Sequence, residues 1–371
     1  MVIGNAKIFV NGEFVEGTLS IENGMITAVG SADAAYDLDA NGCYLVPGFV
    51  DIHTHGAVNE DFSDGNGDGL NSLSRYYAER GTTSFLATTM TLPERLLLPA
   101  MHAVRDFVRP GGGAKCAGVH LEGPFLCANK RGAQALENLH SPDFDMFTRL
   151  NEESGNKVRI ITVAPETDGA IPFIEKASGI CVVSLGHTEA DYQTAMDAFH
   201  AGASHVTHLF NCMPAMHHRA PGVIGAAMDS GATVELICDG LHIHPSVIRA
   251  AYKMFGEKLV VVSDSLRCAG MPDGIYELGG QTVEVKDGKA TLQGSETLAG
   301  SSTSLLQELR NLVTFGIPLE NALTAVTYAP AKAAGLDSKI GSIRVGLQAD
   351  FLLLTKELEL AAVYIDGKNI L

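Results

Sequence analysis

The hydrophobic positions of this chain change their spacing between two β-rich ends and a middle in which strand and helix patterns alternate. Three dipeptides typical of hairpin turns separate β-prone segments near the ends: Asn11-Gly12, Asn23-Gly24 and Asp366-Gly367. The two ends therefore show the same pattern of β-prone segments and tight turns, and the middle of the chain shows a different pattern. We predict one small β-sandwich module, built from residues 1–46 plus 337–371 and interrupted by a large central domain.

The central domain, residues 47–336, alternates apolar runs with amphipathic helical patterns. The expected strands cover residues 44–52, 83–88, 116–121, 158–163, 180–185, 205–209, 234–237 and 259–263. The expected helices cover residues 70–80, 92–108, 144–153, 190–200, 245–255, 303–315 and 319–334. Gly81 and Gly202 follow two of these helices as stops, and Thr188 precedes another as a cap. Strands joined mostly by helical crossovers predict an α/β fold, a TIM-type (β/α)8 barrel.

Polar residues follow the expected strands with a regularity that scattered side chains would not have. They are His53 and His55 after the first strand, Glu122 after the third, His187 after the fifth, His208 in the sixth, Asp239 and His242 after the seventh, and Asp264 after the eighth. The carboxyl ends of all strands in such a barrel lie on one rim, where active sites are built. The pattern therefore predicts a single site at this rim.

These residue types are metal ligands and proton carriers. Glu122, His187 and His208 offer one carboxylate and two imidazoles, a set that suits zinc or iron and leaves a position open for water. His53 and His55 point to one face of a strand, so they offer ligands to the same ion or to a second ion bridged by Glu122. A bound divalent cation lowers the pKa of its water toward about 7. The alternative for each residue alone is a structural polar contact.

Composition narrows the choice of partners. The 371 residues are 46% hydrophobic and 19% charged, and the formal net charge of −17 argues against nucleic acid or an anionic membrane as a partner. The seven cysteines are scattered without any CxxC pair, and the start shows no secretory pattern, so we expect a cytoplasmic protein. His217, His218 and Arg219 form a local cationic cluster that suits a phosphate, although a solvated surface turn is the alternative.

Seven short motifs carry a resemblance to a known family. In chain order they are PGFVDIHTHG at 47–56, HLEGPF at 120–125, LGHTEA at 185–190, THLFN at 207–211, CDGLH at 238–242, VSD at 262–264 and LAGS at 298–301. Together they resemble the amidohydrolase superfamily and, within it, the N-acetylglucosamine-6-phosphate deacetylases. The resemblance runs in order over nearly the whole chain, and HLEGPF with THLFN is its most specific part.

The resemblance implies a reaction and a role for each matching residue. The reaction is hydrolysis of N-acetylglucosamine 6-phosphate to glucosamine 6-phosphate and acetate, with one or two zinc or iron ions in each subunit of a homodimer. Glu122, His187 and His208 match the metal ligands, and Asp264 matches the catalytic aspartate. The implied substrate contacts are Ala133, Gln134, Asn211, Cys212, Arg219, Asp239, His242, Leu298, Ala299 and Gly300. Part of the phosphate site would come from the neighbouring subunit.

One position departs from the family pattern, and three alternative functions stay open. Gln134 stands where the family often has histidine, so this side chain can hydrogen-bond a substrate but cannot carry a proton. An amidohydrolase for a cyclic amide or for a different N-acyl compound would commonly use a lysine after the fourth strand, where residues 158–166 contain none. An N-acetylgalactosamine-6-phosphate deacetylase would differ only in recognition of a sugar hydroxyl. A non-catalytic barrel would lack ligands or Asp264, and here none is missing.

Overall fold

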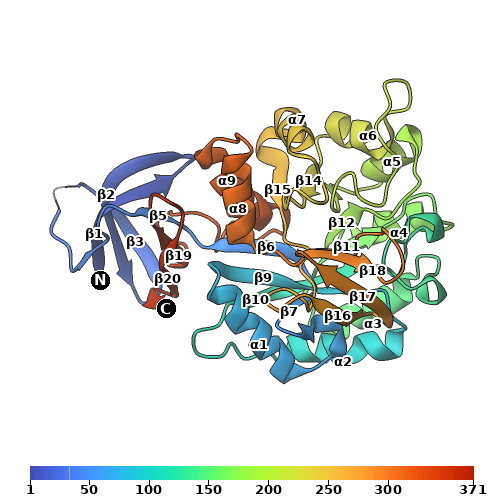
Figure 1. Cartoon of the computed structure of the whole chain (residues 1–371), viewed down its shortest axis with the longest axis horizontal. Coiled ribbons are helices and arrows are strands. Elements are labelled where there is room, and N and C mark those ends of the chain that lie inside the picture. The colour runs from blue at the N-terminus through green and yellow to red at the C-terminus, as the bar shows by residue number, and fades with distance from the viewer. Residues whose placement is uncertain (33) are drawn as a thin grey trace.

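The computed structural model describes residues 1–32 and 34–371 and contains two sheets that account for most of its strands. The strands of the first sheet come from both ends of the chain. They are β1 (Val2–Val10), β2 (Glu13–Glu22), β3 (Met25–Gly30), β4 (Leu38–Asp39), β5 (Tyr44–Pro47), β19 (Phe351–Leu354), β20 (Leu360–Ile365) and β21 (Lys368–Asn369). This β module lies at one end of the molecule and carries both termini (Figure 1).

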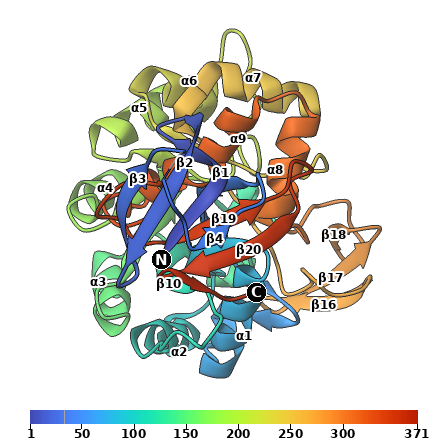
Figure 2. The same ribbon diagram turned by 90° about the vertical axis from the view of Figure 1, so that its left-hand side faces the viewer.

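The two ends of the chain meet inside this sheet. Its order is β21-β20-β19-β5-β1-β2-β3, with β4 beside β1, and β19 pairs antiparallel with β5 so that Phe351 lies opposite Pro47. Figure 2 shows the blue strands β1, β2 and β3 in the same module as the red strands β19 and β20. Ile8 and Leu19 from the first part share a core with Phe351 and Tyr364 from the last part. The module of both termini is confirmed, although its strands form one continuous sheet. The residue limits of the two domains stay predictions.

The second sheet is a nearly closed parallel barrel. Its strands follow chain order: β6 (Phe49–Thr54), β9 (Thr82–Thr89), β10 (Lys115–Glu122), β11 (Val158–Val163), β12 (Val182–Leu185), β13 (His205–Val206), β14 (Thr233–Leu236) and β15 (Leu259–Val261). The first and last strands are bridged just past β15, where the Asp264 N–H donates to the His53 carbonyl at 2.9 Å. The Ser263 hydroxyl also donates to Asp51 at 2.6 Å. The TIM-type barrel is confirmed.

Helices surround the barrel (Figure 2). They are α1 (Gly67–Ala78), α2 (Glu94–Arg105), α3 (Phe144–Glu153), α4 (Ala170–Ala177), α5 (Tyr192–His200), α6 (Gly222–Ser230), α7 (Pro245–Phe255), α8 (Leu305–Thr314), α9 (Leu319–Val326) and α10 (Tyr328–Ala333). None of the helices in the described ranges is both long and apolar enough to cross a membrane. The connections also contain a two-stranded ribbon of β7 (Gly56–Ala57) with β8 (Glu60–Asp61). Short 3-10 helices in the described part of the chain are η1 (Phe62–Asp64), η2 (Ala128–Lys130), η3 (Leu136–Asn138) and η4 (Gly256–Lys258).

The first expected strand, residues 44–52, is two strands in two different sheets. The chain leaves the module at the end of β5 and enters the barrel in β6 through Gly48. A Cβ on Gly48 would lie 2.1 Å from Thr83 Oγ1, so no other residue fits at this crossing. The Gly48 N–H donates to the Asp350 carbonyl at 3.0 Å, which ties the crossing to the C-terminal part of the module.

Several helix expectations need correction. Residues 319–334 form two helices because Pro330 removes a donor and its ring crowds the carbonyl four residues earlier, so α9 ends at Val326. Thr188 is not the cap of α5: Asp191 is, since its side chain accepts from the Thr194 N–H at 2.8 Å. Helices α4 and α6 were not expected. Helix α6 is buried over most of its length and lacks a polar face, so its sequence shows no helical period.

A three-stranded sheet, made of β16 (Gly274–Leu278), β17 (Gln281–Lys286) and β18 (Lys289–Leu292), was also not expected. It is inserted between β15 and α8, and its buried side chains pack with Met90 and Leu266 from the barrel. Residues 281–286 do alternate between exposed and buried positions, so the strand signal is present in the sequence. This sheet contributes to the wall of the cavity described below.

Lys115 links the barrel to the β module, and its removal is expected to destabilise the protein. Its ammonium lies 2.8 Å from Asp350, whose side chain is 2% exposed, and 2.5 Å from Asp366. Lys115→Met leaves the Asp350 carboxyl buried without its cation, which we expect to cost about 3 kcal/mol. Thermal unfolding followed by circular dichroism should show a melting temperature lower by several degrees.

The control for this change is Glu94→Gln, which breaks the more exposed pair with Arg149 (2.7 Å). Such surface pairs contribute about 0–1 kcal/mol, so the control should unfold close to the wild type. A Lys115→Met variant as stable as this control would mean that the buried cluster does not hold the two parts together.

Candidate active site

A cavity of about 290 Å³ opens at the carboxyl ends of the barrel strands. It brings together most of the residues that the sequence singled out: His55, Glu122, Ala133, Gln134, His187, His208, Asn211, Cys212, His242, Asp264, Leu298, Ala299 and Gly300. Further lining comes from residues that the sequence did not indicate: Met90, Ile237, Leu266, Leu278, Glu296 and Thr297. His53, Asp239 and Arg219 lie outside this lining. The volume is near the lower limit for small-molecule sites.

Glu122, His187 and His208 form the tightest group of possible metal ligands. Glu122 Oε1 lies 3.1 Å from His187 Nε2 and 3.0 Å from His208 Nε2, and the two ring nitrogens are 3.0 Å apart. All three side chains are buried. Burial alone would raise the pKa of Glu122, but the neighbouring His53, His187 and His208 outweigh it and hold that pKa well below its usual range.

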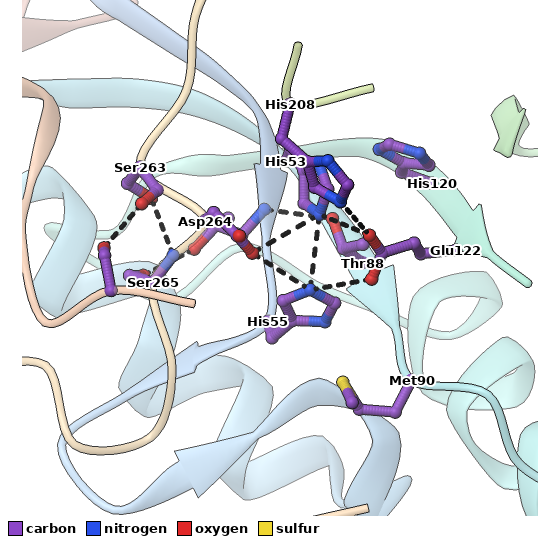
Figure 3. A network of polar contacts seen from close by, with 12 residues as sticks. His53, His55, Thr88, Met90, His120, Glu122, His208, Ser263, Asp264 and Ser265 are labelled. Atoms are coloured by element: carbon purple, nitrogen blue, oxygen red, sulfur yellow. Dashed lines mark hydrogen bonds and ion pairs between the residues drawn. The ribbon is translucent and has the colours of Figure 1, made fainter. Parts of the chain in front are cut away.

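A second group lies beside the first. His53 Nε2 and His55 Nε2 are 3.3 Å apart and lie 3.4 Å and 3.3 Å from Asp264 Oδ1 (Figure 3). Glu122 joins the two groups, because its Oε1 lies 3.4 Å from His53 and its Oε2 lies 3.3 Å from His55. Burial opposes ionisation of Asp264, yet the contacts with His53 and His55 lower its pKa below the usual value. Both groups therefore present ionised carboxylates.

The donor atoms of these groups fit a divalent cation. His187 Nδ1 lies 2.8 Å from the Lys130 carbonyl, and His53 Nδ1 lies 2.8 Å from Glu235 Oε2, so each Nδ1 carries the proton. Each Nε2 is then the ring atom directed at the carboxylate of Glu122, where either a proton or a metal ion can lie between them. Imidazole nitrogens that converge on one carboxylate at about 3 Å are the donor set of a divalent cation such as zinc. The residues present therefore fit a metal.

His120, the first residue of the HLEGPF motif, has a different part. Its Nδ1 lies 3.0 Å from the Ile52 carbonyl and its Nε2 lies 2.8 Å from Thr162 Oγ1, so both ring nitrogens have partners. Burial, with the nearby His53, lowers the pKa of His120 to about 3. The ring is a neutral packing element behind the metal groups.

The backbone of three site residues adopts a conformation that side chains normally avoid. His187, His208 and Asp264 have φ values of 48°, 29° and 46° and lie just past β12, β13 and β15. A non-glycine residue at positive φ is held there by its surroundings, and such positions cluster at functional sites. Hydrogen bonds fix Asp264 on both sides, because its N–H donates to His53 and its carbonyl accepts from Ser301 (2.8 Å).

Two predicted substrate contacts support other site residues. The Thr91 N–H donates to Gln134 Oε1 at 2.8 Å, which leaves the Gln134 amide N–H₂ to donate to Glu122 Oε2 at 2.7 Å. Asp239 Oδ2 lies 2.7 Å from His242 Nδ1, and burial of the Asp239 carboxyl is outweighed by this contact, which lowers its pKa. Gln134 therefore orients the Glu122 carboxylate, and Asp239 orients the His242 ring at the cavity wall.

The predicted phosphate cluster lies apart from the cavity. His217, His218 and Arg219 are exposed in the turn between β13 and α6. Arg219 Nη1 contacts His218 Nε2 at 2.6 Å, and the two histidine rings lie 4.2 Å apart. Within one subunit, the guanidinium is not among the groups that line the cavity.

Glu235 is a polar residue of this region that the sequence analysis did not single out. It lies in the middle of β14 and is fully buried, with contacts to His53, His205 and the backbone of His208. The signal was a single carboxylate inside an otherwise apolar strand, because alternation along β14 directs Glu235 to the interior while Val234 and Leu236 face the other way.

Comparison with known proteins gives a consistent family. The amidohydrolase family model matches residues 44–370. N-acetylglucosamine-6-phosphate deacetylase from Vibrio furnissii is 35% identical over 355 residues, which is 94% of this chain and 88% of that protein. N-acetylgalactosamine-6-phosphate deacetylase from Escherichia coli O157:H7 is 33% identical over 355 residues, with 94% and 93% covered.

The comparison with solved structures also covers the whole chain. The crystal structure of N-acetyl-D-glucosamine-6-phosphate deacetylase from Mycobacterium smegmatis superposes with a TM-score of 0.94 at 32% identity, and 100% of each chain is covered. The match includes the β module of both termini as well as the barrel. With ligand groups at the barrel rim and this coverage by sequence and fold, the chain belongs to the amidohydrolase family of metal-dependent hydrolases.

Proposed function

We propose that this protein hydrolyses the N-acetyl group of N-acetylglucosamine 6-phosphate and releases glucosamine 6-phosphate and acetate. The observation that carries the proposal is the meeting of two groups of possible metal ligands at one cavity on the barrel rim, one group with the carboxylate of Glu122 and the other with that of Asp264. The relatives with this name cover most of the chain at more than 30% identity, which supports the same substrate class.

The proposed metal ligands are Glu122, His187 and His208, and the ion is zinc or iron. His53 and His55 would hold a second ion with Asp264, and Glu122 would lie between the two. When bound, a divalent cation supplies Lewis acidity, which favours ionisation of a water molecule and polarises the acetyl carbonyl. These side chains hold their Nε2 and carboxylate oxygens ready for it before any substrate enters.

Asp264 is the proposed general base and acid. Its lowered pKa keeps the carboxylate ionised, so it can take a proton from the attacking water as the new C–O bond forms. The same proton then goes to the sugar nitrogen as the amide C–N bond breaks, so the leaving group departs as an amine. The two hydrogen bonds on its backbone keep the carboxylate aimed at the cavity during both transfers.

The sugar and its phosphate would be held by the remaining wall of the cavity. His242 lines it, and Leu298, Ala299 and Gly300 form the side contributed by the loop that follows β18. We assign the backbone of Asn211 and Cys212, with Ala133, to the sugar itself.

The phosphate requires a cation, and Arg219 is the proposed one. Because Arg219 does not reach the cavity of its own subunit, we propose a homodimer in which the neighbouring subunit supplies it. The seven cysteines are free, which supports a reducing compartment, and we propose the cytoplasm.

N-acetylgalactosamine 6-phosphate is a second candidate substrate. The observation in its favour is the Escherichia coli relative, which carries that name and is covered as fully as the relatives named for the glucosamine compound. The two sugars differ at one hydroxyl, so the same metal ligands and the same aspartate serve either reaction. Acetate release from both compounds, measured side by side, decides between them.

Metal content tests the proposed ligands. Replacing both His53 and His55 by Asn is expected to reduce the bound ion from two equivalents per chain to one, because neither histidine belongs to the group of Glu122, His187 and His208. Glu122→Gln, which removes charge from both groups, should lower both. Elemental analysis of the purified proteins gives the numbers, with His102→Asn, an exposed histidine paired with Glu153, as the control. Unchanged metal in the double variant would remove His53 and His55 from the proposal.

Asp264→Asn tests the proton carrier. The variant should keep its melting temperature and the ion at Glu122, His187 and His208, whereas kcat for acetate release falls by about 100- to 10,000-fold, the usual contribution of a general base. Asp106→Asn, an exposed aspartate outside the site, is the control. Turnover close to that of the wild type in Asp264→Asn would leave the chemistry without an assigned base.

Arg219→Met tests the phosphate site. The wild type should prefer the phosphorylated sugar strongly, and the variant should lose roughly 10- to 100-fold of that preference through a higher KM, the magnitude of a charge-assisted hydrogen bond. Arg149→Met, which removes an exposed arginine elsewhere, should keep the preference. Equal rates of the wild type on phosphorylated and unphosphorylated sugar would contradict any phosphate site.

A further inference from the structure

Glu235 is a buried carboxylate that touches both groups of proposed metal ligands without belonging to the cavity. Its side chain is 0% exposed. Its Oε2 lies 2.8 Å from His53 Nδ1 and accepts the backbone N–H of His208 at 3.1 Å. One oxygen atom therefore contacts a residue of each group.

The other carboxylate oxygen of Glu235 also has a hydrogen-bond partner, the ring of His205. Oε1 lies 3.0 Å from His205 Nε2, and His205 Nδ1 in turn lies 2.5 Å from Thr233 Oγ1. The carboxylate thus has three N–H donors around it, and its orientation is fixed from two neighbouring strands, β13 and β14. A buried carboxylate needs such a full set of donors, since an unpaired charge in this environment is expensive.

We propose that Glu235 is a positioning residue that fixes the tautomer of His53. Through its contacts with the His53 ring and the His208 backbone, it also keeps the two groups of proposed ligands at a fixed separation. With Nδ1–H donated to Glu235, the His53 ring presents Nε2 as its ligand atom toward Asp264 and Glu122. The inference rests on the proposed metal-ligand roles of His53 and His208, and it needs no assumption about the substrate. A carboxylate behind a ligating imidazole also raises the basicity of the ligand.

A purely structural role predicts a different outcome. Glu308 is an equally buried carboxylate that accepts a backbone N–H, that of Cys238, at 2.5 Å and carries none of the proposed ligand roles. If Glu235 only fills space and satisfies donors, Glu235→Gln and Glu308→Gln should affect stability alone. If Glu235 positions His53, only its replacement should change metal binding and the tautomer of the ring.

The first measurement is metal binding without substrate. Apoprotein prepared with a chelator is titrated with Zn²⁺ in a calorimeter. Glu235→Gln, which keeps the shape but not the charge, is expected to weaken the ion bound at His53 by roughly 10- to 100-fold, the usual effect of removing such an outer partner. Glu308→Gln should give the wild-type isotherm. A wild-type isotherm for Glu235→Gln, or equal weakening in both variants, would overturn the proposal.

The second measurement reports the tautomer directly and does not depend on the variant being stable. In wild-type protein labelled with ¹⁵N-histidine and loaded with Zn²⁺, nuclear magnetic resonance should show the His53 ring protonated at Nδ1 and not at Nε2, with the signal identified by its loss in His53→Asn. A His53 ring protonated at Nε2 alone would overturn the proposal by itself. Both measurements leave out the sugar phosphate, so failure of the proposed deacetylase reaction would not affect them.

Discussion

The Glu122 carboxylate is the point on which the rest of the site depends. The Nε2 atoms of His53, His55, His187 and His208 all lie within 3.4 Å of it. These imidazoles come from β6 and from the ends of β12 and β13, and only a closed parallel barrel brings those strand ends onto one rim. Removing so many polar groups from water is unfavourable unless each has a partner of opposite charge or a hydrogen bond, so the barrel must hold them in register. The proposed divalent cation would supply the charge that they share.

The β module contributes to this precision although it lies far from the chemistry. β5 pairs with β19 and leads, through Gly48, directly into the strand that ends with His53 and His55. The crossing is tight, because a side chain at Gly48 would collide with Thr83. Lys115, at the start of the strand that carries Glu122, is held by Asp350 of the module. Two of the strands that bear ligands are therefore anchored at their far ends by the terminal sheet.

The sequence predicted the barrel and the rim because both follow from local pattern plus one topological rule. His53, Glu122, His187 and Asp264 could be placed together since strand ends in a parallel barrel share an edge. Other features depend on contacts between distant residues, which no local pattern encodes. The partner of Gln134 is one, since its amide turns to Glu122 only because the Thr91 N–H takes its oxygen.

Other failures of the sequence analysis have separate physical causes. Thr188 resembled a helix cap, but its hydroxyl is bound to Glu166 instead, and Asp191 caps α5 in its place. The inserted sheet of β16, β17 and β18 lies outside the eight strand-and-helix units, so a barrel template gives no place for it. Glu235 was missed because it is a single carboxylate inside an apolar strand, and one polar residue does not produce a recognisable periodic pattern.

The net charge of −17 and a phosphorylated substrate are compatible only if a few cations act at short range. Charges in water at physiological salt are screened beyond about 8 Å, so the acidic surface repels a phosphate less than its total suggests. His242 lies at the cavity wall outside the two groups of proposed metal ligands, and its Nδ1 contacts Asp239 at 2.7 Å. Arg219 is turned toward His218 at the surface of its own chain. In the proposed dimer this exposed arginine would instead be a phosphate ligand for the neighbouring subunit.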